Sequence, residues 1–97
     1  MGAVLTCCWR CPQIIPYNAT KLAGRHNAVV AVVSYRLGPL GFAAFREDGH
    51  AGTGNYGTHD ILTAAAWLKR EARSLGANPD RIIAFGESSG ATDAQVW

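Results

Sequence analysis

The stretch Ile82-Ile83-Ala84-Phe85-Gly86-Glu87-Ser88-Ser89-Gly90, late in the 97-residue chain, decides the fold. An apolar, β-prone segment runs directly into the pattern G-x-S-x-G, and this order predicts a nucleophile elbow. In an elbow the serine stands at a strand-to-helix turn so tight that the residues two positions to either side must be small, as Gly86 and Gly90 are. The pentapeptide also occurs by chance in loops, so a Gly/Ser turn that merely closes the strand is the alternative.

A nucleophile elbow would make the hydroxyl of Ser88 available for attack on a substrate. This hydroxyl would stand clear of the sheet, on a strained backbone, and the amide of Ser89 would point at an oxygen bound beside it. We therefore predict Ser88 as the nucleophile and Ser89 as an oxyanion-hole donor. Catalysis also needs a base, usually a histidine oriented by an acid, and in elbow-type enzymes both follow the serine. After Ser88 the sequence has one acid, Asp93, and no histidine, so the nucleophile lacks its base.

The composition is that of one small globular domain, with 48% hydrophobic and 16% charged residues. A net charge of +2, with scattered basic residues, argues against a nucleic-acid partner. No apolar run reaches the roughly 18–20 residues that span a bilayer. We expect no cofactor and no metal. Cys8 and Cys11 have C-x-x-C spacing but no second ligand pair, and Pro12 and Pro16 disfavour the helix of a thiol-redox site.

The first residues allow two interpretations. Met1 to Thr6 fits the N-myristoylation pattern M-G-x-x-x-[ST], with Cys7 and Cys8 as palmitoylation candidates beside it. We favour the plainer interpretation, in which residues 3–8 form a short strand or the arbitrary start of an incomplete chain. The stretch lacks the charged region and long apolar core of a secretory signal, so localisation stays open. Asn18-Ala19-Thr20 is a glycosylation sequon, which matters only in a secreted chain.

The rest of the chain alternates strands and helices, which predicts an α/β fold with a parallel sheet. The expected elements are a short helix capped by Asn18 or Thr20 and closed by Gly24, a strand over 28–35, a loop over 42–57 and a helix over 58–75. The strand over 28–35 is continuously β-branched, which is typical of a strand buried on both faces. The helix over 58–75 has apolar residues, Leu75 among them, at three- and four-residue spacing, and Gly76 is its expected end.

Several segments together carry a resemblance to a known family. They are Tyr17-Asn18, Val32-Val33-Ser34-Tyr35-Arg36-Leu37-Gly38-Pro39-Leu40-Gly41-Phe42, Gly54-Asn55-Tyr56-Gly57, Ala66-Trp67-Leu68, Asn78-Pro79-Asp80-Arg81-Ile82 and Phe85-Gly86-Glu87-Ser88. In this order and spacing, over residues 17–90, the chain resembles the type B carboxylesterases, the cholinesterase-like branch of the α/β-hydrolase fold. The pair Y-R-L-G-P-L-G-F and G-E-S-x-G at this separation is highly specific.

The resemblance implies a partial α/β-hydrolase fold with a short parallel sheet of about three strands, flanking helices and a strand–elbow–helix unit. It implies a carboxylic-ester hydrolase in which Ser88 forms an acyl-enzyme with a small-molecule ester. Ser89 would donate to the oxyanion, and Glu87 would line the substrate site; a buried, hydrogen-bonded acid is the alternative for Glu87. The family's strand order would place residues 3–8 in the middle of the sheet, parallel to the strand over 28–35 and to the elbow strand.

The chain also departs from the family. The family's His-Gly-Gly-Gly loop is missing, since the sequence contains no Gly-Gly pair, and Ser89, Ile61 and Ala91 replace a usual alanine, glutamine and glycine. With the acid and histidine absent, residues 1–97 are expected to be an amino-proximal fragment of a type B carboxylesterase domain, inactive alone. The alternatives are a non-catalytic cholinesterase-like interaction module, which commonly loses the elbow serine, and a truncated product without independent function.

Four other matching residues are assigned to structure rather than chemistry. Arg36 and Asp60 are expected to form an ion pair, and Tyr56 and Trp67 are expected to be core aromatics. A partial sheet leaves strand edges open, so self-association is expected as well.

Overall fold

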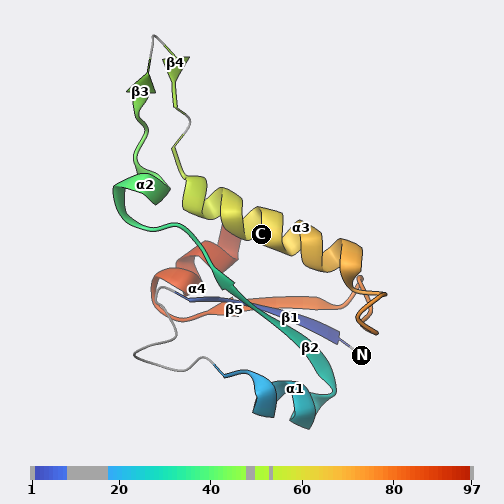
Figure 1. Ribbon diagram of the computed structural model, residues 1–97. Helices are drawn as coiled ribbons and strands as arrows, with labels where there is room; N and C mark the ends of the chain where they lie inside the picture. The colour runs from blue at the N-terminus through green and yellow to red at the C-terminus, as the bar shows by residue number, and fades with distance from the viewer. Residues whose placement is uncertain (1, 9–17, 48–49, 53, 97) are drawn as a thin grey trace.

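The structure is a computed structural model, and it describes residues 2–8, 18–47, 50–52 and 54–96. The elements run β1 (Gly2–Cys8), α1 (Thr20–His26), β2 (Ala28–Ser34), α2 (Gly38–Phe42), β3 (Arg46–Glu47), β4 (His50–Ala51), α3 (Tyr56–Glu71), β5 (Ile82–Gly86), α4 (Ser89–Asp93) and the 3₁₀ turn η1 (Ala94–Val96). Figure 1 shows the three longer strands as one layer, with α3 along it.

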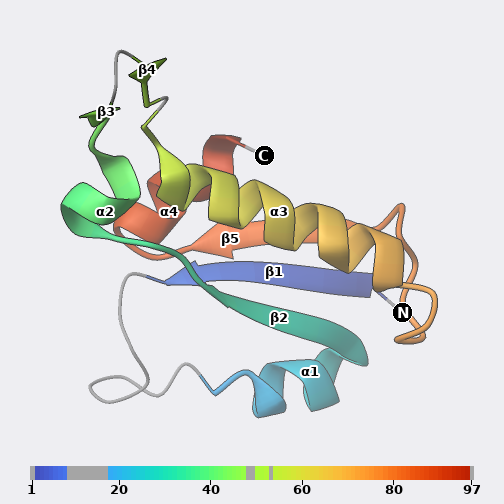
Figure 2. The ribbon, with the colours of Figure 1, turned by 45° about the horizontal axis from the view of Figure 1, so that its top comes forward.

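Strands β2, β1 and β5 form one sheet, in that order. The central strand β1 pairs in parallel with both neighbours, so that Leu5 lies opposite Ala31 on β2 and Ala84 on β5. This is the arrangement that the sequence predicts for residues 3–8. Figure 2 shows the three strands side by side, with α3 above them and α1 below.

Helix α3 covers one face of the sheet through a stripe of buried residues. Ile61 and Leu68 are fully buried. The side chains that pack there are Tyr35, Ile61, Ala65, Leu68, Ala72 and Ala77, with Val29, Ala31, Val33, Leu37, Ile82 and Ala84 against them. The three- and four-residue spacing along α3 is thus the core pattern that the sequence indicates. Helix α1 lies against the other face, where Ala23 and Gly24 border a cavity shared with Val30.

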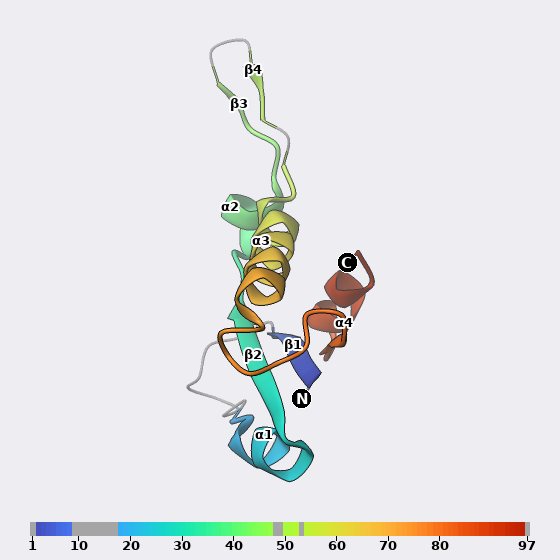
Figure 3. The same cartoon turned by 90° about the vertical axis from the view of Figure 1, so that its right-hand side faces the viewer.

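That second face is only partly covered. Val32 of β2 is 41% exposed, and Ile83 and Phe85 of β5 are 65% and 45% exposed. These residues alternate along their strands with those that face α3. The expectation that the strand over 28–35 is buried on both faces is therefore wrong, because α1 covers only part of the second face of β2 (Figure 3).

The boundaries of α1 and of α3 both differ from the sequence prediction. Helix α1 continues past Gly24 and ends at His26, and the residue that follows, Asn27, takes the left-handed conformation at φ 47°. Asparagine tolerates this conformation, so it can replace glycine at a helix end. At the other end the cap residue is Ala19, which makes no side-chain hydrogen bond, so the predicted cap at Asn18 or Thr20 is wrong. Asn18 Oδ1 instead accepts a hydrogen bond from the Thr20 amide at 3.0 Å, in the turn that leads into the helix.

Helix α3 begins at Tyr56 and ends at Glu71 rather than spanning 58–75. The chain then turns, and Gly76 has φ +78°, which confirms it as the left-handed residue after the helix. Leu75 is 44% exposed and does not join the apolar face, because it lies in that turn.

The segment over 42–57 is not simply a loop. It follows a short helix, α2, with proline in the first turn, where the missing amide costs no hydrogen bond. Strands β3 and β4 then pair antiparallel, Arg46 with Ala51 and Glu47 with His50. This hairpin projects from the body of the molecule in Figures 1 and 3. Periodicity missed it because two-residue strands are too short to show alternation.

Some sequence predictions fall outside the described residues. Met1 of the acylation pattern and Cys11 of the C-x-x-C pair lie there, as do Pro12 and Pro16. Within the described residues, no helix is both long and apolar enough to cross a membrane. The same residues contain no group of three or more histidine, cysteine or acidic side chains arranged to hold a metal ion.

Candidate active site

Ser88 stands at the turn between β5 and α4, with φ 54° and ψ −124°. Positive φ is rare for a residue with a side chain, and this ψ lies outside the left-handed helical region as well. Such a conformation typically costs about 1–3 kcal/mol and persists only where the surroundings impose it. Ser88 therefore lies in neither a regular strand nor a helix, which confirms the predicted elbow geometry and contradicts an ordinary turn.

The two glycines of the motif make this turn possible. A Cβ on Gly86 would lie 2.3 Å from the carbonyl carbon and oxygen of Gly90 and 2.7 Å from the Ala91 nitrogen. The end of β5 thus touches the backbone of the first turn of α4, and there is no room for a side chain. The G-x-S-x-G spacing reflects this close approach rather than a need for positive φ at Gly86.

The first amides of α4 differ in whether they are already bonded. The Gly90 amide donates to the Glu87 carbonyl at 2.9 Å, and the Ala91 amide donates to the Ser88 carbonyl at 3.0 Å. For the Ser89 amide, no hydrogen bond is found within the described part of the chain. It can therefore donate to an oxygen bound beside Ser88, as an oxyanion-hole amide must.

Ser89 also has a side-chain partner that the sequence did not reveal. The Tyr35 and Ser89 hydroxyl oxygens lie 3.1 Å apart, a hydrogen-bonding distance at which either can donate. Tyr35 is only 6% exposed. Its ring meets that of Phe42 edge to face, with centroids 6.4 Å apart and planes at 86°. A separation of 54 residues hides this pair from pattern reasoning, although a buried tyrosine hydroxyl generally requires a partner.

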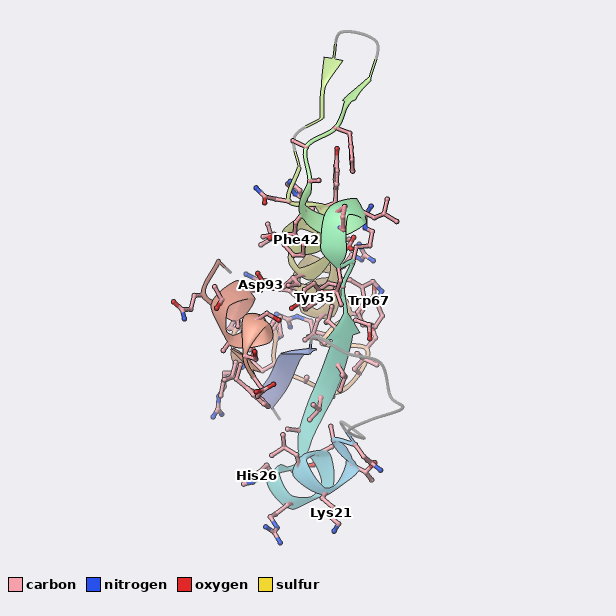
Figure 4. All side chains as sticks on the ribbon, turned by 90° about the vertical axis from the view of Figure 1, so that its left-hand side faces the viewer. Lys21, His26, Tyr35, Phe42, Trp67 and Asp93 are labelled. Carbon is pink, nitrogen blue, oxygen red and sulfur yellow. The ribbon has the colours of Figure 1, made fainter. Side chains whose placement is uncertain are left out.

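A pocket of about 330 Å³ opens beside these residues. It is lined by Tyr35, Leu37, Gly38, Phe42, Ser89, Thr92 and Asp93. Figure 4 labels Tyr35, Phe42 and Asp93, which reach this region from the end of β2, from α2 and from α4. The pocket wall is mostly apolar. Besides Tyr35, its polar groups are the hydroxyls of Ser89 and Thr92 and the carboxylate of Asp93.

Glu87 is exposed, and within the described residues its carboxylate has no hydrogen-bond partner. The alternative of a buried, hydrogen-bonded acid is therefore wrong. The backbone carbonyl of Glu87 accepts the Gly90 amide in the first turn of α4, while the carboxylate of Glu87 stays in solvent.

The expected ion pair between Arg36 and Asp60 is confirmed. Arg36 donates from Nε to Oδ2 at 2.8 Å, from Nη2 to Oδ1 at 2.7 Å and from its backbone amide to Oδ2 at 3.0 Å. Hydrogen bonding from Arg36 lowers the pKa of Asp60, and the same bond raises the pKa of Arg36. The pair ties the segment after β2 to the first turns of α3.

Neither of the two aromatics assigned to the core belongs to it. Tyr56 is half-buried, and its ring lies under the Arg36 guanidinium, 5.5 Å from centroid to Cζ. Trp67 is 47% exposed, so its assignment to the core is wrong. It lies on α3 away from the buried stripe of Ile61 and Leu68, on the side of the helix that the sheet does not cover (Figure 4).

No base accompanies Ser88 in the described residues. There, no histidine or carboxylate makes a hydrogen bond to Ser88 Oγ. His26 ends α1 and His59 lies in the first turn of α3, and both are exposed.

Comparison with known proteins places this geometry in context. The family model described as the carboxylesterase family matches residues 9–97. Cocaine esterase of Homo sapiens is 45% identical over 76 residues, which are 78% of this chain and 13% of the relative. Bile salt-activated lipase of Bos taurus is 39% identical over 80 residues, 82% of this chain and 13% of the relative. Para-nitrobenzyl esterase of Bacillus subtilis (strain 168) is 35% identical over 74 residues, 76% of this chain and 15% of the relative.

A solved structure agrees with these relatives. The crystal structure of Aspergillus niger EstA superposes with a TM-score of 0.74 at 28% identity, covering 93% of this chain and 19% of that chain. The chain thus spans less than a fifth of each of these proteins. With its elbow, its parallel sheet and its matched residues, the chain belongs to the carboxylesterase family and has part of the α/β-hydrolase fold.

Proposed function

We propose that residues 1–97 are the nucleophile-bearing, amino-proximal part of a serine carboxylic-ester hydrolase. The observation that carries the proposal is Ser88 at φ 54° between β5 and α4, inside the family's G-E-S-x-G. Two relatives are named as esterases, of cocaine and of para-nitrobenzyl compounds, and this supports a small-molecule ester as the substrate class.

The proposed reaction has two steps. Ser88 Oγ attacks the carbonyl carbon of the ester while a base takes its proton, and the alcohol leaves with a proton, so that an acyl-serine ester remains. Water then attacks that ester, and the acid and the Ser88 hydroxyl are released. The Ser89 amide would donate to the oxyanion in both steps, and Glu87 would line the substrate side of the elbow.

We further propose that these residues alone do not turn esters over. The described residues give Ser88 no base, and the sequence has no Gly-Gly loop to supply further oxyanion donors. Hydrolases that lose triad members keep only the catalysis due to binding and the oxyanion hole. The isolated chain should hydrolyse 4-nitrophenyl acetate little faster than buffer. Fast, saturable turnover abolished by Ser88→Ala would contradict this, whereas acylation of cysteine or lysine would survive that substitution.

The serine mechanism is tested by returning the chain to a complete domain. The matching segment of the Bacillus para-nitrobenzyl esterase would be replaced by this chain, and hydrolysis of 4-nitrophenyl acetate measured for the folded chimera. We expect activity that falls by at least about 10⁴-fold in Ser88→Ala, the order of loss seen when a catalytic nucleophile is removed. Ser74→Ala, a change to an exposed serine in the turn after α3, is the matched control and should keep the activity.

The non-catalytic alternatives predict a different result. An interaction module or a truncated product has no need of a nucleophile in an imposed, strained conformation, yet Ser88 is present and strained. A folded chimera as inactive as its Ser88→Ala variant would favour those alternatives and overturn the proposal.

A further inference from the structure

The contact between Tyr35 and Ser89 joins the elbow to the end of β2. The two hydroxyls lie 3.1 Å apart although the residues are 54 positions apart in the chain. Both residues also line the pocket of about 330 Å³ beside the elbow. Ser89 supplies the amide that the proposed function assigns to the oxyanion hole, so whatever holds Ser89 also aims that amide.

We infer that Tyr35 is a positioning residue of the elbow, which holds the Ser89 amide in its orientation through the Ser89 hydroxyl. The inference rests on the proposed function in one respect, the role of the Ser89 amide as an oxyanion donor. The contact between Tyr35 and Ser89 is independent of that function. Tyr35 touches no reacting atom in this account. It acts through Ser89.

The elbow needs such support. Ser88 has φ 54° and ψ −124°, a strained backbone conformation that persists only where the surroundings impose it. Helix α4 is only five residues long and has no side-chain hydrogen bond at its cap. The contact of Gly86 with Gly90 fixes how closely strand and helix approach, and a restraint from β2 would oppose rotation of the helix about that contact.

Tyr35 is well placed to prevent that rotation. It is buried, and its ring is braced edge to face by Phe42 of α2. The next residue, Arg36, is held by Asp60 of α3 through three hydrogen bonds. The hydroxyl of Tyr35 therefore projects from a segment anchored to both α2 and α3, and a hydrogen bond to it restrains the first residue of α4.

The hydrogen bond to Tyr35 also gives the serine side chain at position 89 a structural role. An alanine there would keep the backbone amide but could not reach Tyr35. In this chain the hydroxyl pair links the elbow to β2, and both members of the pair are needed for the link.

The test uses amide hydrogen exchange of the full 97-residue chain, measured by NMR, and requires no activity. The reporters are the Gly90 and Ala91 amides, which hydrogen-bond within the first turn of α4. In Tyr35→Phe we expect them to exchange about five-fold faster, the factor that one typical net hydrogen bond implies. Ser89→Ala removes the same bond from the other side and should give the same factor.

A double variant and a control make the result specific. Tyr35→Phe combined with Ser89→Ala should show no further acceleration at these amides, since either change alone already removes the bond between Tyr35 and Ser89. Tyr56→Phe removes a different tyrosine hydroxyl and should leave the Gly90 and Ala91 amides unchanged.

Unchanged exchange rates of the Gly90 and Ala91 amides in either single variant would overturn the inference, and so would additive accelerations in the double variant. Equal acceleration of the amides of β2 and α3 would overturn it as well, because it would mean a general loss of stability. Failure of the ester hydrolysis test would leave this outcome untouched, because the exchange of these amides does not need the enzyme's catalytic base.

Discussion

Replacing Gly86 with alanine tests the packing of the elbow directly. The added Cβ would lie 2.3 Å from the carbonyl carbon and oxygen of Gly90 and 2.7 Å from the nitrogen of Ala91. All three are backbone atoms, so no side chain can rotate away and the start of α4 must move. Overpacking a well-packed site typically costs about 1–3 kcal/mol, and we expect a value near the upper end because backbone has to shift.

The assay is urea unfolding followed by far-ultraviolet circular dichroism at pH 7. With a slope of about 1–3 kcal/mol per molar urea, a loss of about 3 kcal/mol lowers the midpoint by about 1–3 M. Gly24→Ala is the matched control, because a Cβ there meets nothing within 4 Å and the residue lies inside α1. Alanine in a helix interior is favoured over glycine by about 0.5–1 kcal/mol, so this midpoint should rise.

The reasoning is refuted if Gly86→Ala unfolds at the wild-type midpoint while its Ser88 amide keeps the wild-type chemical shift. A loss of the same size in Gly24→Ala would also refute it, since the effect would then be unrelated to the close approach of β5 and α4.

Two further predictions concern charge and surface. Asp60→Asn should lower stability at pH 7: hydrogen bonding from Arg36 lowers the folded pKa of Asp60, so its contribution is present above the unfolded pKa of about 3.9. That contribution is lost as pH falls through the lower folded pKa, so the urea midpoints of the variant and the wild type should converge in acid; a gap that persists in acid would contradict this. Ile83→Lys should weaken self-association in analytical ultracentrifugation, because Ile83 is 65% exposed on the edge strand β5. Leu40→Lys, on α2 and 77% exposed, should not, and an equal effect would place the contact elsewhere.

The parts of the fold that could be predicted are those with a local cause. The apolar strand before G-x-S-x-G and the two glycines predict the conformation of Ser88, because close backbone approach admits no other residue type. The stripe on α3 follows from helical periodicity. The Arg36–Asp60 pair followed from opposite charges at matched family positions.

The parts that could not be predicted depend on contacts distant in sequence or on neighbours. Tyr35 and Ser89 meet only because β2 and α4 converge at one end of the sheet. Trp67 is exposed because the sheet covers only one side of α3, and Val32 is exposed because α1, among the described residues, covers only part of that face of β2. The apolar character of Trp67 and Val32 does not reveal whether a neighbouring element covers them.

The central claim, that Ser88 is the nucleophile, is tested most directly by locating a covalent adduct. The esterase chimera carrying this chain would be incubated with a fluorophosphonate, which phosphonylates an activated serine with loss of fluoride, and then digested for peptide mass spectrometry. We expect one adduct within this chain, on Ser88, and none in Ser88→Ala. An adduct on Ser89, Ser34 or Ser74 instead, or labelling of the chain that is unchanged in Ser88→Ala, would contradict it.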